Sequence, residues 1–112
     1  MLNIGFIGCG GIARHHANQL AQLRNARIVA CADASRAAAR SFAADFGHGG
    51  AQVFTDHRQM LRLDAVDAVW VCTPTFLHAG PAIDTAKAGK HVFCEKPMAM
   101  KLADARRMQA AC

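Results

Sequence analysis

The feature that most constrains this chain is an apolar run that breaks into a cluster of glycines near the N-terminus. Residues 4–7 form the run, and Gly8, Gly10 and Ala13 follow at the spacing G-x-G-x-x-G/A. A short apolar run closed by glycines predicts a buried strand, a tight turn and the start of a helix. The opening of the chain is therefore expected to be a strand-turn-helix unit.

The three small positions of this pattern each have a physical reason in dinucleotide binding. Gly8 permits the sharp turn, Gly10 allows a pyrophosphate to approach the backbone, and Ala13 allows the helix to pack closely on the strand. Backbone N–H groups of the first helical turn, at Gly11 and Ile12, would face the phosphates, and the helix dipole favours their negative charge. The pattern predicts an anion site built mostly from backbone.

A second strand is predicted at residues 27–33 and ends in an acid, Asp33. This carboxylate lies about 20 residues beyond the glycine turn, where a ribose-binding acid is expected in a dinucleotide-binding unit. Asp is also a common cap of a following helix, here one that starts near Ser35. Both roles are compatible, and the ribose role is favoured.

Strands and helices alternate along the whole chain. Strands are predicted at residues 3–7, 27–33, 52–54, 65–72 and 91–94, and helices at 11–23, 35–46, 56–60, 75–88 and 101–111. Right-handed crossovers between parallel strands then give an α/β, doubly wound Rossmann sheet of order 3-2-1-4-5. The helix at 11–23 is expected to place Ile12, His16, Leu20 and Leu23 together on one face, because they recur at helical spacing.

Size and composition indicate a single globular domain, residues 1–112. The chain has 112 residues, of which 53% are hydrophobic and 6% aromatic, and its formal net charge is +5. No apolar run approaches the about 18 residues of a membrane span, and the N-terminus lacks a secretory signal, so we expect a cytoplasmic protein with no membrane partner. Basic residues are scattered, with no run longer than Arg106-Arg107, which argues against nucleic-acid binding.

The cysteines and histidines do not indicate a metal site or a disulfide framework. The five cysteines form no C-x-x-C pair, and four of them lie at or near the ends of predicted strands, where they are expected to be small buried side chains. His15 and His16 have no partner at metal-ligand spacing, so one exposed ring and one packed ring are expected.

Two later loops carry candidate reaction chemistry. The fourth strand leads into Thr73-Pro74 with His78 four residues further on, and the fifth leads into Glu95-Lys96-Pro97. With the glycine turn and Asp33, these motifs resemble the glucose-fructose oxidoreductase, inositol dehydrogenase and MocA (Gfo/Idh/MocA) family of NAD(P)-dependent oxidoreductases. The resemblance covers essentially the whole chain, which is similar to the N-terminal, cofactor-binding half of such enzymes.

The resemblance implies roles for residues in these loops. Lys96 would lie beside the nicotinamide and hydrogen-bond the substrate oxygen whose proton moves during hydride transfer, and Glu95 would contact the nicotinamide-side ribose. Thr73 and Pro74 would line the cofactor near its nicotinamide end, and His78 would lie close to the cleft.

The cofactor is expected to be NAD, with NADP possible. Ser35 and Arg36 lie where a 2′-phosphate would be held, but the charge of Asp33 opposes that phosphate.

The sequence departs from the family in what it does not contain. Members carry a second sheet domain that supplies an acid and a histidine, commonly as D-x-x-x-H, and this chain has no such segment. We therefore expect a fragment of a two-domain enzyme, homo-oligomeric at full length, that acts on a sugar, polyol or related hydroxyl compound through the second domain. The isolated chain would bind NAD(H) weakly and show little turnover. Two alternatives stay open: a non-catalytic module that senses redox state, and a related reductase of imine or biliverdin-like substrates.

Overall fold

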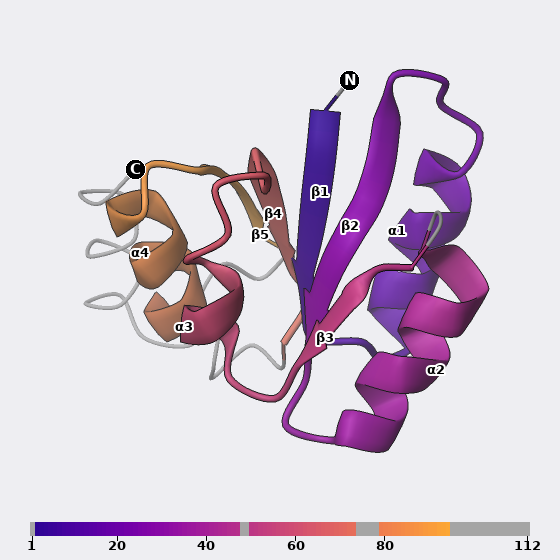
Figure 1. Cartoon of the computed structure of the whole chain (residues 1–112), viewed down its shortest axis with the longest axis horizontal. Helices are drawn as coiled ribbons and strands as arrows, with labels where there is room; N and C mark the ends of the chain where they lie inside the picture. The colour runs from indigo at the N-terminus through magenta and orange to yellow at the C-terminus, as the bar shows by residue number, and fades with distance from the viewer. Residues whose placement is uncertain (1, 48–49, 74–78, 95–112) are drawn as a thin grey trace.

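The computed structural model describes residues 2–47, 50–73 and 79–94. Five parallel strands form one sheet in the order β3-β2-β1-β4-β5, which confirms the predicted fold and strand order. The strands are β1 (Leu2–Ile7), β2 (Ala26–Ala32), β3 (Gln52–Phe54), β4 (Ala68–Val71) and β5 (His91–Cys94). All five carboxyl ends lie at one edge of the sheet, the lower edge in Figure 1.

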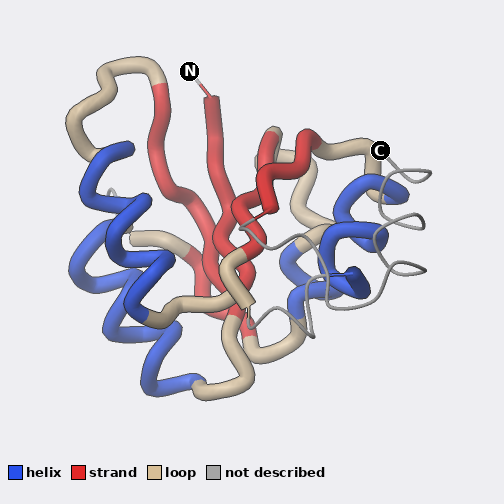
Figure 2. Tube along the Cα trace, turned by 180° about the vertical axis from the view of Figure 1, so that it is seen from behind, coloured by secondary structure: helices blue, strands red, loops and turns tan. Residues whose placement is uncertain are grey.

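Helices cover both faces of the sheet. The helices α1 (Gly11–Leu20) and α2 (Arg36–Phe46) lie on one face, and α3 (His57–Met60) and α4 (Ala79–Lys87) lie on the other (Figures 1 and 2). This division follows from right-handed crossovers, since the chain moves outward from β1 to β3 and then returns to β4 on the opposite side. None of the described helices is long and apolar enough to cross a bilayer.

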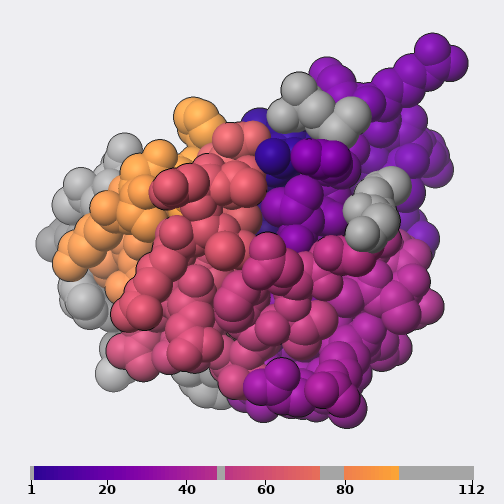
Figure 3. Space-filling view, in the orientation of Figure 1, coloured from indigo at the N-terminus to yellow at the C-terminus, as the bar shows by residue number. Residues whose placement is uncertain are grey.

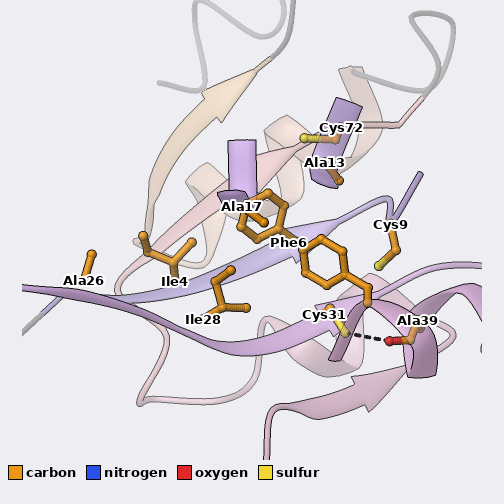
Figure 4. Close-up of a cluster of buried hydrophobic side chains, with 11 residues drawn as sticks. Ile4, Phe6, Cys9, Ala13, Ala17, Ala26, Ile28, Cys31, Ala39 and Cys72 are labelled. Carbon is orange, nitrogen blue, oxygen red and sulfur yellow. Dashed lines mark hydrogen bonds between the residues drawn. The ribbon is translucent and has the colours of Figure 1, made fainter. Parts of the chain in front are cut away.

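Alternation along β1 divides the core into two layers. The side chain of Phe6 enters the layer beneath α1 and α2, where its ring centroid lies 5.0 Å from that of Phe42. The next side chain, Ile7, enters the layer beneath α3 and α4, with Met60 and Ile83. Neighbouring residues of a strand point to opposite faces, so a short apolar run can contribute to both layers. Figure 4 shows the first layer.

The structure corrects the predicted packing of the first helix. Ala13 and Ala17 are fully buried, whereas Ile12 and Leu23 are 46% and 51% exposed. Two alanines four residues apart let the helix axis approach the sheet closely, so the larger Ile12 side chain points outward. The helix also ends at Leu20, because a turn follows in which Leu23 N–H donates to the Leu20 carbonyl (3.0 Å).

His16 keeps the expected position on the packed side of α1. Its ring centroid lies 4.9 Å from that of Trp70 on β4, whereas His15 is exposed. One packed and one exposed ring were predicted, and this prediction is confirmed.

Other boundaries shift by a few residues for local reasons. The strand predicted at residues 65–72 is β4, and it starts only at Ala68 because Val66 N–H closes a turn on the Leu63 carbonyl (3.2 Å). The helix predicted at 35–46 starts at Arg36, with Ser35 as its N-cap. The helix predicted at 75–88 is described only from Ala79 and ends at Lys87, before Gly89 in a left-handed conformation (φ 77°). The helix predicted at 101–111 lies outside the described residues.

Candidate functional site

The turn after β1 is held so tightly that only glycine fits at its first position. Gly8 has a φ of 90°, and its N–H donates to the Ala32 carbonyl (2.8 Å). A Cβ placed on Gly8 would lie 2.7 Å from the carbonyl carbon of Cys72 and 2.8 Å from the backbone nitrogen of Thr73. The chain leaving β4 therefore packs directly on the turn, and Gly8 has the turn-forming role predicted for it.

The two glycines that follow have the opposite surroundings. A Cβ on Gly10 or on Gly11 would meet nothing within 4 Å. Gly10 is the N-cap of α1 in an extended conformation, with no side-chain cap, and the first turn of the helix contains no acid. The N–H groups at this end have no carbonyl of a preceding turn to bind, so Gly11 and Ile12 leave backbone donors beside open space.

This arrangement fits the pyrophosphate of a dinucleotide. A phosphate needs close approach to backbone N–H groups and a positive dipole end without a competing carboxylate, and the first turn of α1 has both properties. Ala13, fully buried, holds the helix against the sheet as the third small position predicts.

The carboxylate of Asp33 joins the end of β2 to the glycine turn. Its Oδ2 accepts a hydrogen bond from Cys9 N–H (2.8 Å), and its Oδ1 accepts one from Ser35 N–H (2.8 Å). Each carboxylate oxygen has a second lone pair, so both can still accept a ribose hydroxyl. Asp33 is thus placed beside the turn as predicted, and it also orders both loops.

The cap of α2 belongs to Ser35 rather than to Asp33. Ser35 Oγ accepts from Ala38 N–H (3.2 Å), and Asp33 instead binds the backbone of Ser35 itself. Arg36, the first residue of the helix, is exposed, and no hydrogen bond of its side chain is found among the described residues. Its guanidinium is therefore exposed, at a residue three positions after Asp33 in the sequence.

The loop after β4 is described only at its start. Cys72 N–H continues the sheet by donating to the Ile7 carbonyl (2.8 Å), and the backbone of Thr73 lies against Gly8. Thr73 therefore lies next to the glycine turn, at the same sheet edge. The other predicted site residues, Pro74, His78, Glu95 and Lys96, lie outside the described residues.

Three buried cysteines lie near the glycine turn. Cys9, Cys31 and Cys72 are buried, as predicted for these three, and no disulfide links them to one another. The pKa of the Cys9 thiol is raised strongly, first by its hydrogen bond with Cys31 and then by burial and by the nearby Asp33 carboxylate. Cys9 is therefore a neutral packing group and not a nucleophile.

A histidine that the sequence reasoning missed lies at the same sheet edge. A cavity of about 130 Å³ is lined by Ile7, Ala32, Asp33, Ala34, Thr55 and His57. His57 Nε2 lies 2.8 Å from Asp84 Oδ2, which links α3 to α4. The pair is 27 residues apart in sequence, so no local pattern marks it. The one available signal was a histidine just after a short strand that ends at the ligand-binding edge.

A larger cavity, about 330 Å³, lies away from this edge. It lies on the α1 face and extends to the amino ends of the strands, and its apolar lining includes Leu2, Leu23, Trp70 and Phe93. Its position does not match the ligand-binding edge of a doubly wound sheet, which lies at the carboxyl ends. No group of acidic, cysteine or histidine side chains suited to a metal is found among the residues that the structure describes.

Comparison with known proteins agrees with this geometry. A family model described as an oxidoreductase family with an NAD-binding Rossmann fold, GFO_IDH_MocA, matches residues 2–112. The chain is 38% identical over 109 residues to a glucose-6-phosphate 3-dehydrogenase of Bacillus subtilis, covering 97% of this chain and 30% of that protein. It is 40% identical over 109 residues to an inositol 2-dehydrogenase of Rhizobium meliloti, covering 97% of this chain and 31% of that protein.

Solved structures show the same fold with nicotinamide cofactors bound. The WlbA dehydrogenase of Bordetella pertussis, in complex with NADH and UDP-GlcNAcA, matches with a TM-score of 0.91 and 37% identity, over 99% of this chain and 33% of that one. A 3-ketoreductase of Actinomadura kijaniata in complex with NADP matches with a TM-score of 0.87 and 34% identity, over 98% of this chain and 34% of that one. The chain thus spans about a third of the length of these relatives. It belongs to the Gfo/Idh/MocA family of oxidoreductases and has that family's NAD-binding Rossmann fold.

Proposed function

We propose that this chain binds NAD(H) at the carboxyl edge of its sheet and serves as the cofactor domain, residues 1–112, of a longer oxidoreductase. The observation that carries the proposal is the contrast between adjacent glycines. Gly8 has no room for a side chain, whereas Gly10 and Gly11 face open space beside the start of α1. This contrast leaves free backbone donors where a pyrophosphate would rest.

The adenosine end of the cofactor would extend toward β2. Asp33 would accept hydrogen bonds from the ribose hydroxyls while it continues to hold the N–H groups of Cys9 and Ser35. NAD is favoured because the Asp33 charge repels a 2′-phosphate. Arg36 is exposed at the start of α2, and with Ser35 it provides a route to NADP binding.

The nicotinamide end would extend toward the loops after β4 and β5. Thr73 lies against the glycine turn, and we assign Pro74 and His78 to the cofactor cleft and Glu95 to the nicotinamide-side ribose, on the family resemblance. When bound, the nicotinamide would accept or donate the hydride. Lys96 would orient the substrate oxygen and exchange its proton as the carbon–hydrogen bond is made or broken.

The substrate would be a sugar, a polyol or a related hydroxyl compound. Relatives of this chain include a glucose-6-phosphate 3-dehydrogenase and an inositol 2-dehydrogenase. Because those proteins are about three times as long, the groups that choose the substrate and complete the reaction would come from a further domain. We place the protein in the cytoplasm, and we expect the full-length enzyme to be a homo-oligomer.

Calorimetric titration of the 112-residue chain with NADH tests the binding proposal. Gly10→Ala should fold normally, since its Cβ meets nothing within 4 Å, yet weaken NADH binding at least tenfold by displacing the pyrophosphate. Gly80→Ala is the matched control, because its Cβ also enters open space, but in α4. Equal NADH affinity in wild type and Gly10→Ala would contradict the proposal.

Hydride transfer should require the rest of the enzyme. With NAD and a panel of polyols, the 112-residue chain should show little or no turnover, because the acid and histidine expected from a second domain would not be positioned. Rapid turnover by this chain alone would contradict the two-domain assignment. It would not affect the proposal that the chain binds NADH.

A further inference from the structure

The cavity beside Asp33 has two polar side chains, Thr55 and His57, that neither the glycine turn nor the ribose role explains. His57 comes from the start of α3, next to the end of β3, and shares this cavity with Asp33 and Thr55. In Figure 3 the segment from β3 to α3 fills the middle of the visible face, between α4 and α2. His57 therefore stands at the ligand-binding edge although it belongs to neither of the two motif loops.

Asp84 fixes the histidine ring. The 2.8 Å contact between His57 Nε2 and Asp84 Oδ2 is partly buried, and the His57 side chain is 24% exposed. A carboxylate can only accept, so Nε2 carries a proton in this contact. In the neutral imidazole the other nitrogen, Nδ1, is then an acceptor. No hydrogen bond to Nδ1 is found within residues 2–47, 50–73 and 79–94.

The cavity suits part of a ligand and not a whole one. At about 130 Å³ it is smaller than the about 300–1,000 Å³ of pockets that enclose a drug-sized molecule. It opens beside the carboxylate assigned to the adenosine ribose. Since the base is attached to that ribose, one edge of the base is the ligand part that can reach this space.

We propose that His57 is a specificity-determining residue of the dinucleotide site and that its Nδ1 accepts a hydrogen bond from the 6-amino group of adenine. This inference rests on the proposed NAD(H) function. Asp84 is a positioning residue, because it acts only through the His57 ring. An acceptor at this position selects a base edge that carries a donor, and it disfavours a base that presents a carbonyl oxygen there.

The test compares NADH with reduced nicotinamide hypoxanthine dinucleotide, in which a carbonyl oxygen replaces the 6-amino group. Calorimetric titration of the wild-type chain should give about tenfold tighter binding of NADH, as expected when one hydrogen bond is replaced by two facing acceptors. His57→Phe, which keeps a ring but removes the acceptor, should bring the affinity ratio close to one. Asp84→Ala, which frees the ring, should lower the ratio to an intermediate value.

His91→Ala is the matched control. His91 is exposed at the amino end of β5, at the opposite edge of the sheet, so the wild-type ratio should persist. Circular dichroism of each variant establishes that it is folded. If His57→Phe does not fold, Asp84→Ala still tests the contact between His57 and Asp84. Equal binding of the two dinucleotides by the wild type, or an unchanged ratio in His57→Phe, would overturn the assignment of His57 alone. Binding of neither dinucleotide would overturn both this assignment and the proposed NAD(H) function.

Discussion

Asp33 accepts a 2.8 Å hydrogen bond from the backbone N–H of Cys9, so the first residue of the β2–α2 loop holds the glycine turn in place. A second bond from Ser35 N–H fixes the start of α2 to the same carboxylate. One side chain thus orders the two loops that would meet the phosphate and the ribose. Under the proposed function, ligand binding and local order are coupled at this residue.

Asp33→Ala should weaken both functions of that carboxylate. Loss of two acceptors leaves the N–H groups of Cys9 and Ser35 without their partner, and we expect the free energy of unfolding to fall by about 1–3 kcal/mol. NADH affinity should fall about tenfold or more, and NADPH affinity should fall less because the opposing charge is removed. Urea unfolding and calorimetric titration measure the two effects.

The control for Asp33→Ala is Asp64→Ala, an exposed acid that makes no hydrogen bond with the described residues. It should change neither stability nor NADH affinity. If Asp33→Ala bound NADH as tightly as the wild type does, the ribose assignment would be wrong, whatever the change in stability.

Gly8→Ala should destabilise the chain far more than an ordinary glycine replacement. The new Cβ combines a left-handed φ of 90° with backbone atoms at 2.7 and 2.8 Å, so the β4 loop would have to move. We expect a loss of about 3 kcal/mol or more. Gly89→Ala provides the comparison, because Gly89 has a φ of 77° in open space and should cost only about 1–2 kcal/mol. Thermal unfolding that gave equal losses for both variants would contradict the packing described for Gly8.

Phe42→Ala should be among the most costly core substitutions. Phe42 is fully buried, and its ring contacts Phe6 at 5.0 Å and Phe46 at 5.1 Å between centroids. The resulting cavity should lower the free energy of unfolding by about 3–5 kcal/mol. Phe93→Ala, at a residue that is 51% exposed, should cost clearly less. Urea unfolding of both variants would decide the point, and similar losses would show that the core is not centred on Phe6 and Phe42.

Asp56 should make a contribution to stability that disappears in acid. Its carboxylate caps α3 through Arg58 N–H, and hydrogen bonds from the Arg58 side chain and backbone lower its pKa below the ordinary 3.8. A lowered folded-state pKa stabilises the fold above the unfolded value, and this stabilisation is lost as the pH falls through the folded value. The difference in Tm between wild type and Asp56→Asn should be constant above about pH 5 and shrink below about pH 4. A difference that grew in acid would show the opposite sign of linkage.

The order of the strands, and with it the sheet edge that carries the candidate site, could be predicted from the sequence, because both depend on local periodicity and chirality. Residues 4–7 and the following glycines predict a strand, a turn and a helix start, and Asp33 follows the next strand. Because the crossover between the two parallel strands is right-handed, Asp33 is expected to lie close to the glycine turn. That Gly8 has no room for a Cβ whereas Gly10 faces open space could not be predicted, since this difference depends on how the chain near Cys72 packs on the turn. The predicted packing of Ile12 was also wrong, because helical spacing alone does not show that the side of the helix with Ala13 and Ala17 lies closest to the sheet. The pairing of His57 with Asp84 was decided only by tertiary structure: the two residues lie in separate helices on one face of the sheet, and nothing in either local sequence encodes their 2.8 Å contact.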